Sequence, residues 1–229
     1  MPCCAQCEGI EKEFNAKVAA RELAAYRRRG VGGTTKILID LLRGHAVTGA
    51  TLLDVGGGIG AIQHELAGAG PGEVTSVDAS PAYLEAQRAE AVRRGYADRV
   101  TYLGGDFVAM ADGVPARDIV TLDRVICCYP DMPALVRSSA MRARHLYGAV
   151  YPRATWWNAA GIRVANAVLR LRRSSFRVYL HAPERIDAMV ASCGLRRAAV
   201  RDTVLWRIAV YTRDGETPAP PDQTNSASH

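Results

Sequence analysis

Long apolar runs are absent from this sequence: no segment holds eighteen consecutive apolar residues. A transmembrane helix is therefore not expected, because a membrane span needs about 20 such residues. The opening residues, MPCCAQCEGIEKEF, also lack the basic region and apolar run that are typical of a signal peptide. These two absences predict a cytoplasmic protein. With 229 residues, of which 48% are hydrophobic, the chain is long enough to bury a sizeable core.

Lysine is scarce, so the formal net charge of +6 is carried almost wholly by arginine. Arginines cluster at 27–29, 170–173 and 196–197. No aromatic-rich basic strand or recognition motif accompanies them, and a nucleic-acid partner is therefore not expected. Such clusters are typical of solvated helix faces, and they also occur where a protein attracts an anionic substrate or a membrane surface. The sequence leaves both interpretations open.

The cysteines do not complete a metal site. The N-terminal run CCAQC has C-x-x-C spacing, but no second such pair and no nearby histidine supplies the remaining ligands. No metal is therefore expected, and in a cytosolic chain the thiols should be reduced. The six cysteines are Cys3, Cys4, Cys7, Cys127, Cys128 and Cys193.

Strand-like and helix-like segments alternate from residue 51 onward, which predicts an α/β fold. Parallel strands joined by helices build a doubly wound, Rossmann-like sheet. Two final strand-like runs are close enough to pair antiparallel, so a mostly parallel seven-stranded sheet with an antiparallel final strand is expected, preceded by N-terminal helices. Expected strands are 51–55, 72–78, 99–106, 117–126, 146–151, 195–202 and 204–212. Expected helices are 8–30, 34–42 capped by Thr34 or Thr35, 60–67, 81–94 capped by Ser80, 131–145, 155–173 and 182–193.

Four glycines in five positions follow the first strand, in the stretch TLLDVGGGIG. Glycine permits positive φ and lets a ligand approach the backbone closely. In a doubly wound sheet the ligand lies at the carboxyl ends of the strands, which is where this loop falls. Gly56, Gly58 and Ala61 fit the dinucleotide pattern G-x-G-x-x-A. A more restrictive pattern adds Asp54 before Gly56, Gly58 and Gly60.

With that acid included, the sequence resembles the class I S-adenosylmethionine-dependent methyltransferases. Their first motif is apolar-apolar-acid-apolar-Gly-x-Gly-x-Gly, and 52–60 match it at every position. The resemblance implies an enzyme that uses S-adenosylmethionine, with Gly56, Gly58 and Gly60 under its methionine part. Asp54 would hold the loop and favour the cofactor's ammonium group. The chain would divide into an N-terminal helical cap (1–45), the cofactor-binding methyltransferase domain (46–213) and a disordered tail (214–229).

Later strand ends supply the other residues that this family uses. Asp78 and Ala79 follow the second strand, where relatives place an acid on both ribose hydroxyls, a contact that suits a carboxylate. Asp106 and Phe107 stand at the end of the third strand and would hold adenine. Tyr26 and Arg27 would meet the cofactor carboxylate, although an exposed helix end explains these two equally well.

The segment DRVICCYPD matches the family's fourth motif, which lines the methyl-transfer channel. Arg124, Cys127, Tyr129 and Trp156 are the expected substrate-lining residues, with the cysteines as packing groups. A carboxylate acceptor is ionised at pH 7 and needs no base, whereas a phenol or amine would benefit from one. Candidates for such a base are Tyr129, Asp131 and His181.

Flanking segments resemble the magnesium protoporphyrin O-methyltransferase branch: YRRRGVGGTTK, YPRATWW and SSFRVYLHAPERID. That branch methylates a propionate on a large, flat, apolar ring, which implies a small-molecule acceptor that is apolar and anionic. Between these segments, 156–173 reads either as an ordinary covering helix or as a lid that contacts the acceptor and a membrane surface.

Two other functions remain open. A nicotinamide-dependent oxidoreductase would use G-x-G-x-x-A and an acid at Asp78, but it leaves Asp54 and Asp106 unexplained. A non-catalytic module would keep the cofactor pocket for interaction alone, and the intact glycine loop argues against it.

Overall fold

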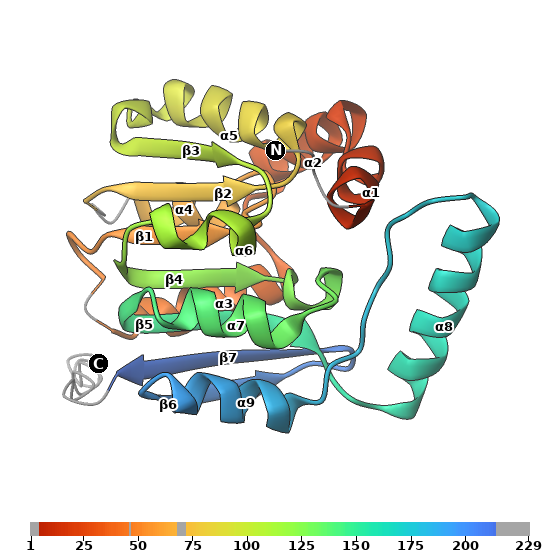
Figure 1. The fold of residues 1–229 in the computed structure, drawn as a ribbon. Coiled ribbons are helices and arrows are strands. Elements are labelled where there is room, and N and C mark those ends of the chain that lie inside the picture. The colour runs from red at the N-terminus through yellow and green to blue at the C-terminus, as the bar shows by residue number, and fades with distance from the viewer. Residues whose placement is uncertain (1–4, 46, 68–71, 214–229) are drawn as a thin grey trace, which may run out of the picture.

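The structure is a computed structural model that describes residues 5–45, 47–67 and 72–213. Its centre is a seven-stranded sheet in the order β3-β2-β1-β4-β5-β7-β6 (Figure 1). Neighbouring strands from β3 to β5 are parallel, whereas β7 is antiparallel to both β5 and β6. The predicted sheet is thereby confirmed. The strands are β1 (Leu52–Val55), β2 (Val74–Asp78), β3 (Val100–Gly104), β4 (Arg117–Asp123), β5 (Ala143–Pro152), β6 (Leu195–Asp202) and β7 (Trp206–Arg213).

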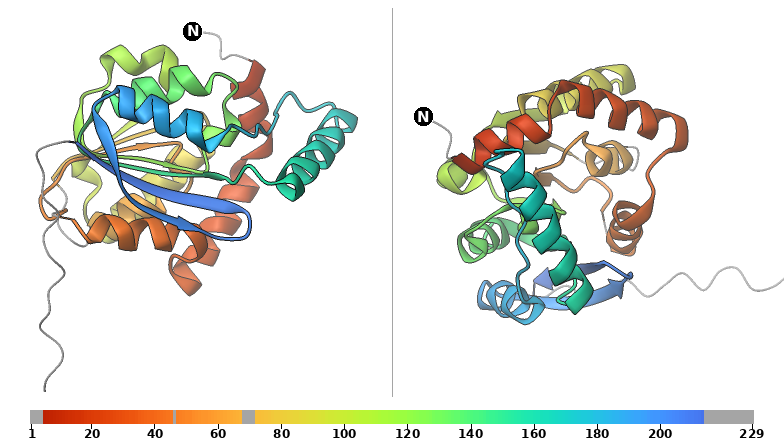
Figure 2. Two further views of the ribbon diagram at one scale, coloured as in Figure 1. Left: turned by 90° about the horizontal axis from the view of Figure 1, so that it is seen from below. Right: turned by 90° about the vertical axis from the view of Figure 1, so that its right-hand side faces the viewer.

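Helices cover both faces of the sheet (Figure 2). One face packs on α3 and α4, and the other on α6, α7 and α9. The helices are α1 (Ala5–Glu13), α2 (Ala16–Arg29), α3 (Gly33–Arg43), α4 (Ala61–Ala67), α5 (Pro81–Arg94), α6 (Phe107–Met110), α7 (Met132–Ala140), α8 (Trp156–Leu171) and α9 (Pro183–Ser192). Three short 3₁₀ turns are η1 (Ala97–Arg99), η2 (Ala111–Gly113) and η3 (Ile126–Cys128).

The strands are apolar on both sides because both sides are buried. In β1, Leu52 packs with α3 and α4, while Leu53 packs in the opposite core with α7. Each such leucine contributes about 1.5–3 kcal/mol through burial. The strand order reverses between β1 and β4, so their carboxyl ends open a crevice that suits a ligand.

The predicted helix over 8–30 is in fact two helices. Asn15 begins α2, and its side-chain oxygen accepts hydrogen bonds from the N–H groups of Lys17 and Val18 at 3.1 and 3.3 Å. This N-cap interrupts the helix and turns Phe14 inward. Gly9 lets α1 cross directly over the backbone at Phe176, where a Cβ would not fit.

Other boundaries differ locally from the predictions. Gly32, not a threonine, is the N-cap of α3, and the Thr35 hydroxyl instead donates to Asp123 at 2.5 Å. The predicted helix over 131–145 ends at Ala140, because the following residues pair with β4 and β7 as the longer strand β5. Ser80 caps α5 as predicted.

The N-terminal helices pack on different parts of the fold. Leu38, Ile39 and Leu42 of α3 are fully buried under β5 and β7, whereas α2 packs on α5. The boundary near residue 45 stays a prediction. The predicted disordered tail and two N-terminal cysteines, Cys3 and Cys4, lie outside the described residues. Within the described ranges, every helix is too short or too polar to cross a bilayer.

Candidate functional site

A cavity of about 420 Å³ opens at the carboxyl ends of β1, β2 and β4. This volume lies in the range of small-molecule sites. Figure 1 shows α1, α2 and α8 on the same side of the sheet as these strand ends. The lining residues are Ile10, Phe14, Glu22, Val55, Gly56, Val77, Asp78, Ala79, Tyr83, Gly105, Asp106, Phe107, Asp123, Arg124, Val125, Cys127, Cys128, Tyr129, Leu135, Phe176, Val178 and Trp206.

The glycine loop has the backbone geometry that its sequence predicts. Gly56, Gly58 and Gly60 have φ values of +64°, +57° and +79°, a region that glycine occupies without penalty. A Cβ at Gly56 would come within 2.5 Å of the Val125 side chain. The loop after β1 therefore packs directly against the segment that follows β4.

Asp54 lies beneath this loop and is fully buried. One carboxylate oxygen accepts a hydrogen bond from the Thr121 hydroxyl at 2.7 Å, and the other has no partner among the described residues. Burial raises the pKa of Asp54 to about 7. A buried acceptor without a partner is costly, so it marks a place where a ligand cation or a water molecule would bind favourably.

Asp78 ends β2 and lines the cavity. Its oxygens accept hydrogen bonds from the N–H groups of Ser80 at 2.8 Å and Gly58 at 3.1 Å. Burial raises the pKa of Asp78 to about 6, although these N–H groups oppose the rise. Each oxygen keeps a second lone pair, so the carboxylate can also accept from two ligand hydroxyls. Ala79 lines the cavity beside it.

Asp106 and Phe107 are also in the cavity wall, at the start of α6. Asp106 accepts hydrogen bonds from the Val108 N–H at 3.0 Å and from the Tyr129 hydroxyl at 3.0 and 3.1 Å. Asp106 is thus both a helix cap and a cavity acid. Tyr129, predicted as a lining residue, holds that acid in place.

Gln87 of α5 is a functional residue that the sequence did not reveal. It is fully buried, its amide nitrogen donates to the Gly58 carbonyl at 2.7 Å, and its amide oxygen accepts from the Ser76 hydroxyl at 2.6 Å. Both backbone polar groups of Gly58 are therefore hydrogen-bonded: its N–H donates to Asp78, and its carbonyl accepts from Gln87. Only the contact between α5 and the loop makes this role visible.

We expect Gln87→Leu to weaken S-adenosylhomocysteine binding by about three- to tenfold. The loss arises because the Gly58 carbonyl and the Ser76 hydroxyl would be left unpaired, which costs about 1–3 kcal/mol. Part of this cost would displace the glycine loop and so weaken binding. Calorimetric titration measures the affinity, and thermal unfolding measures the stability. Gln87→Glu retains an acceptor for Ser76 but loses the donor to Gly58, so it should lose affinity as well if the Gly58 contact carries the effect. Unchanged affinity in both variants would mean that the loop orients itself without Gln87.

Arg124, Cys127 and Cys128 line the cavity from the segment after β4. Arg124 has φ +61° and pairs with Asp123 at 3.1 Å. A hydrogen bond from Cys128, aided by the Arg124 charge, lowers the pKa of the Cys127 thiol, while that same pairing and burial raise the pKa of Cys128. A basic group, Arg124, thus lies near both thiols.

Tyr26 and Arg27 are not brought to the cavity. The Tyr26 hydroxyl donates to Glu65 and accepts from Arg94, both at 2.8 Å, and Arg27 pairs with Glu90 at 2.8 Å. Their predicted contact with the cofactor carboxylate is corrected on this ground, since both polar groups are engaged elsewhere. Residue Glu22, one turn earlier in α2, lines the cavity instead and accepts a hydrogen bond from the Tyr83 hydroxyl at 2.8 Å.

Three further candidates also lie outside the lining. Asp131 caps α7 through the Ala134 N–H at 3.0 Å. His181 lies 3.1 Å from the Tyr129 carbonyl, and burial lowers its pKa. Trp156 is 78% exposed on α8. Asp131 and His181 are therefore positioned as structural groups, and a different tryptophan, Trp206, reaches the cavity.

Part of the cavity lining is a group of apolar residues that lies outside the carboxyl ends of the parallel strands. Ile10 and Phe14 come from the α1–α2 region, Phe176 and Val178 from the segment after α8, and Trp206 from the start of β7. The Phe14 and Phe176 rings meet edge to face at 5.6 Å. No local pattern predicts this group, because its members come from three distant parts of the chain.

The lining carries more negative than positive charge. Its acids are Glu22, Asp78, Asp106 and Asp123, whereas Arg124 is its cation among the described residues. A low-dielectric cavity with this balance favours a cationic ligand. Within the described ranges, no three His, Cys, Asp or Glu side chains are grouped so that they could hold a metal ion.

Comparison with known proteins agrees with this geometry. Residues 52–146 match the family model of the methyltransferase domain. The chain is also 30% identical over 100 residues to the ribosomal protein L11 methyltransferase of Dechloromonas aromatica (strain RCB). That match covers 42% of this chain and 34% of the relative, so it spans only about a third of the relative's length.

Solved structures share the fold over most of the chain. Magnesium protoporphyrin IX methyltransferase from Synechocystis PCC 6803 with bound SAH has a TM-score of 0.68 at 18% identity, covering 90% of this chain and 98% of that one. An O-methyltransferase family protein from Burkholderia thailandensis has a TM-score of 0.64 at 17% identity, covering 90% and 64%. The chain thus contains a segment, 52–146, that matches a methyltransferase domain, within a fold that these solved methyltransferase structures share.

Proposed function

We propose that the chain binds S-adenosylmethionine in this cavity and transfers its methyl group to an oxygen of a small, apolar acceptor. The observation that carries the proposal is the cavity at the switch point, lined by Gly56 of the glycine loop, Asp78 and Asp106. The cofactor supplies an activated methyl group, so the protein's task is to bind and align.

The residues present fit such a cofactor. The partnerless oxygen of Asp54 would accept from an ammonium group or its water, Asp78 would accept from ribose hydroxyls, and Asp106 with Phe107 would hold adenine. The negative balance of the lining complements a ligand that carries a sulfonium and an ammonium charge.

The acceptor would lie against the apolar part of the lining, which includes Phe14, Phe176 and Trp206. A carboxylate acceptor would find Arg124 as its cation, in partial competition with Asp123. It would need no general base because it is ionised at pH 7. The resemblance to the magnesium protoporphyrin branch supports a flat, apolar acceptor with such a carboxylate.

The decisive experiment is a turnover assay with a labelled methyl donor and a panel of flat aromatic carboxylates, phenols and amines. Formation of S-adenosylhomocysteine together with a methyl ester or ether supports the proposal. A thermal-shift series with S-adenosylhomocysteine and NAD runs in parallel. Stabilisation by NAD alone would favour an oxidoreductase, and cofactor binding without turnover on any acceptor class would favour a non-catalytic module.

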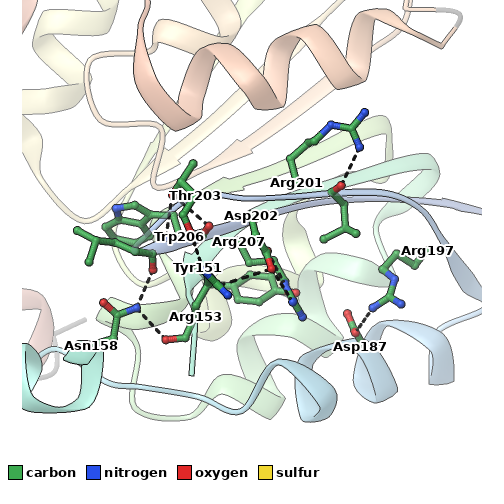
Figure 3. A network of polar contacts seen from close by, with 12 residues as sticks. Tyr151, Arg153, Asn158, Asp187, Arg197, Arg201, Asp202, Thr203, Trp206 and Arg207 are labelled. Atoms are coloured by element: carbon green, nitrogen blue, oxygen red, sulfur yellow. Dashed lines mark hydrogen bonds and ion pairs between the residues drawn. The ribbon is translucent and has the colours of Figure 1, made fainter. Parts of the chain in front are cut away.

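Helix α8 projects away from the sheet, on the side toward which the carboxyl ends of the parallel strands point (Figures 1 and 2). Its first turn is fixed to the β6–β7 hairpin, where the Asn158 amide donates to the carbonyls of Arg153 and Leu205 at 2.8 and 2.7 Å (Figure 3). The helix and the adjacent hairpin expose apolar side chains, and α8 also carries basic ones. The exposed apolar residues here are Trp156, Trp157, Val164, Val168 and Leu171 of α8 and Val204 and Leu205 of the hairpin.

We infer that α8 contacts an anionic membrane surface. No acidic residue occurs in 132–183, whereas nine arginines do. An amphipathic helix of this kind binds a lipid interface through apolar burial and attraction to anionic headgroups. An apolar acceptor dissolved in that interface would then be close to the cavity.

We expect the double substitution Arg172→Ala and Arg173→Ala to weaken binding to phosphatidylglycerol vesicles about thirtyfold, because basic residues near an anionic surface contribute about 1 kcal/mol each. Vesicle co-sedimentation measures this. Affinity for S-adenosylhomocysteine should not change. Arg28→Ala with Arg29→Ala removes the same charge from α2 and should have little effect. Equal losses in both double variants would mean that net charge, not α8, governs the attraction.

A further inference from the structure

Two adjacent thiols face the cavity at a place that the proposed methyl transfer does not require. Cys127 and Cys128 form the end of η3, and both line the cavity. Val125, two residues before Cys127, packs on Gly56 of the glycine loop. The thiols therefore lie beside the loop that would hold the cofactor.

The two side chains point the same way, which adjacent residues in an extended strand would not do. Their sulfur atoms are 3.9 Å apart, and both lie near the Arg124 carbonyl oxygen, at 3.3 and 3.4 Å. The separation is much longer than a disulfide bond of about 2.0 Å. It is short enough for both sulfurs to bond to one centre, since two bonds of about 2.3 Å span at most about 4.6 Å. The pair is thus arranged so that both sulfurs can bond to the same atom.

The number of ligands decides what kind of atom fits. Thiolates select soft, thiophilic centres. A structural metal ion normally takes four protein ligands, but no cluster of three metal-binding side chains exists in the part of the chain that the structure describes. A trivalent metalloid that carries one organic substituent needs only two protein thiols. Its substituent would lie against the apolar lining, which includes Leu135 and Trp206.

We propose that Cys127 and Cys128 form a two-thiol binding site for a trivalent organoarsenical or a chemically similar metalloid compound, within the same cavity. Binding is a ligand exchange. Two As–O bonds of the hydrated arsenical and two S–H bonds break, two As–S bonds form, and two water molecules leave without any change in oxidation state. This site concerns binding alone, and it does not depend on methyl transfer by the chain.

Phenylarsine oxide is the probe, and intact-mass spectrometry of the full chain counts the adducts. Cys3, Cys4 and Cys7 are first replaced together by serine, because the N-terminal C-x-x-C could also bind the reagent. In this background we expect one adduct per chain, which resists excess 2-mercaptoethanol but is removed by 2,3-dimercaptopropanol. Absence of an adduct, or its removal by the monothiol, would overturn the proposal.

Single substitutions then locate the site. Cys127→Ser and Cys128→Ser should each lower the affinity for phenylarsine oxide at least tenfold, whereas Cys193→Ser, the matched control at another free cysteine, should not. Retained affinity in either of the first two variants would contradict a two-thiol site. Far-UV circular dichroism and the thermal unfolding transition serve as the folding check.

A measurement without substitutions at the site covers the case in which those variants do not fold. In the triple-serine background, bound phenylarsine oxide should protect Cys127 and Cys128 together from alkylation, as read by peptide mapping. Protection of only one of them, or of neither, would refute the pair. Zn²⁺ that binds this background more tightly than the arsenical, and competes with it, would overturn the choice of a metalloid over a metal ion.

Discussion

Asp78→Ala is expected to weaken S-adenosylhomocysteine binding at least tenfold, and about a hundredfold if both ribose hydroxyls donate to this carboxylate. Hydrogen bonds to a charged group contribute about 1.5–3 kcal/mol each, and about 1.4 kcal/mol corresponds to tenfold in affinity. The substitution also removes the acceptor of the Gly58 N–H, so the glycine loop loses one of its two fixed points. Calorimetric titration at pH 8 measures the loss.

The same carboxylate should make binding depend on pH. Its pKa is raised to about 6 by burial, and only the ionised form accepts from two hydroxyls at once. Affinity should therefore fall as pH drops through about 6. Asp78→Asn cannot titrate at this position, so its affinity should not fall near pH 6. It should still show the pH dependence near pH 7 that belongs to Asp54. Glu85→Ala, at an exposed acid of α5, should bind like the unmodified chain. Unchanged affinity in Asp78→Ala would mean that the ribose contact is misassigned.

The sequence predicts the polar half of this site well, for a physical reason. Asp54, Asp78 and Asp106 each stand at or just after the end of a parallel strand, and parallel strands end at one edge of the sheet. Once the strands are found by their apolar runs, the positions of these acids follow. The positive φ values of the glycines follow in the same way, because no other residue type occupies that backbone region readily.

The other half of the site could not be predicted because it depends on packing between distant segments. Asn15 divides one expected helix into two, and that break is what turns Phe14 to the cavity, where it meets Phe176. Tyr26 fails as a cofactor contact because α2 carries it past the cavity to Glu65. Glu22 lies on the same helix one turn nearer, and nothing in its local sequence distinguishes it from a solvated acid.

Asp54→Asn is expected to change how stability depends on pH. The pKa of Asp54 is about 7 in the folded chain, compared with 3.8 for an unperturbed aspartate. Between these two pH values the folded chain holds a proton that the unfolded chain has lost, so the free energy of unfolding falls as pH rises. The fall is complete above about pH 7. From pH 5 to pH 8 this costs the unmodified chain about 3 kcal/mol, since about two pH units separate pH 5 from the folded pKa and each corresponds to about 1.4 kcal/mol.

Relative to the unmodified chain, the Asn variant should therefore gain about 6–12 °C in Tm between pH 5 and pH 8, because 1 kcal/mol corresponds to about 2–4 °C in a chain of this size. Using the difference between two pH values removes any fixed cost of packing the amide. Affinity for S-adenosylhomocysteine should fall about tenfold at pH 8, since the neutral amide cannot attract the ligand's ammonium group as the carboxylate does. Parallel Tm curves for the two proteins would show that Asp54 is already ionised at pH 5. A buried acid that destabilises the empty chain above pH 7 yet favours the bound one is the pattern of a residue retained for binding.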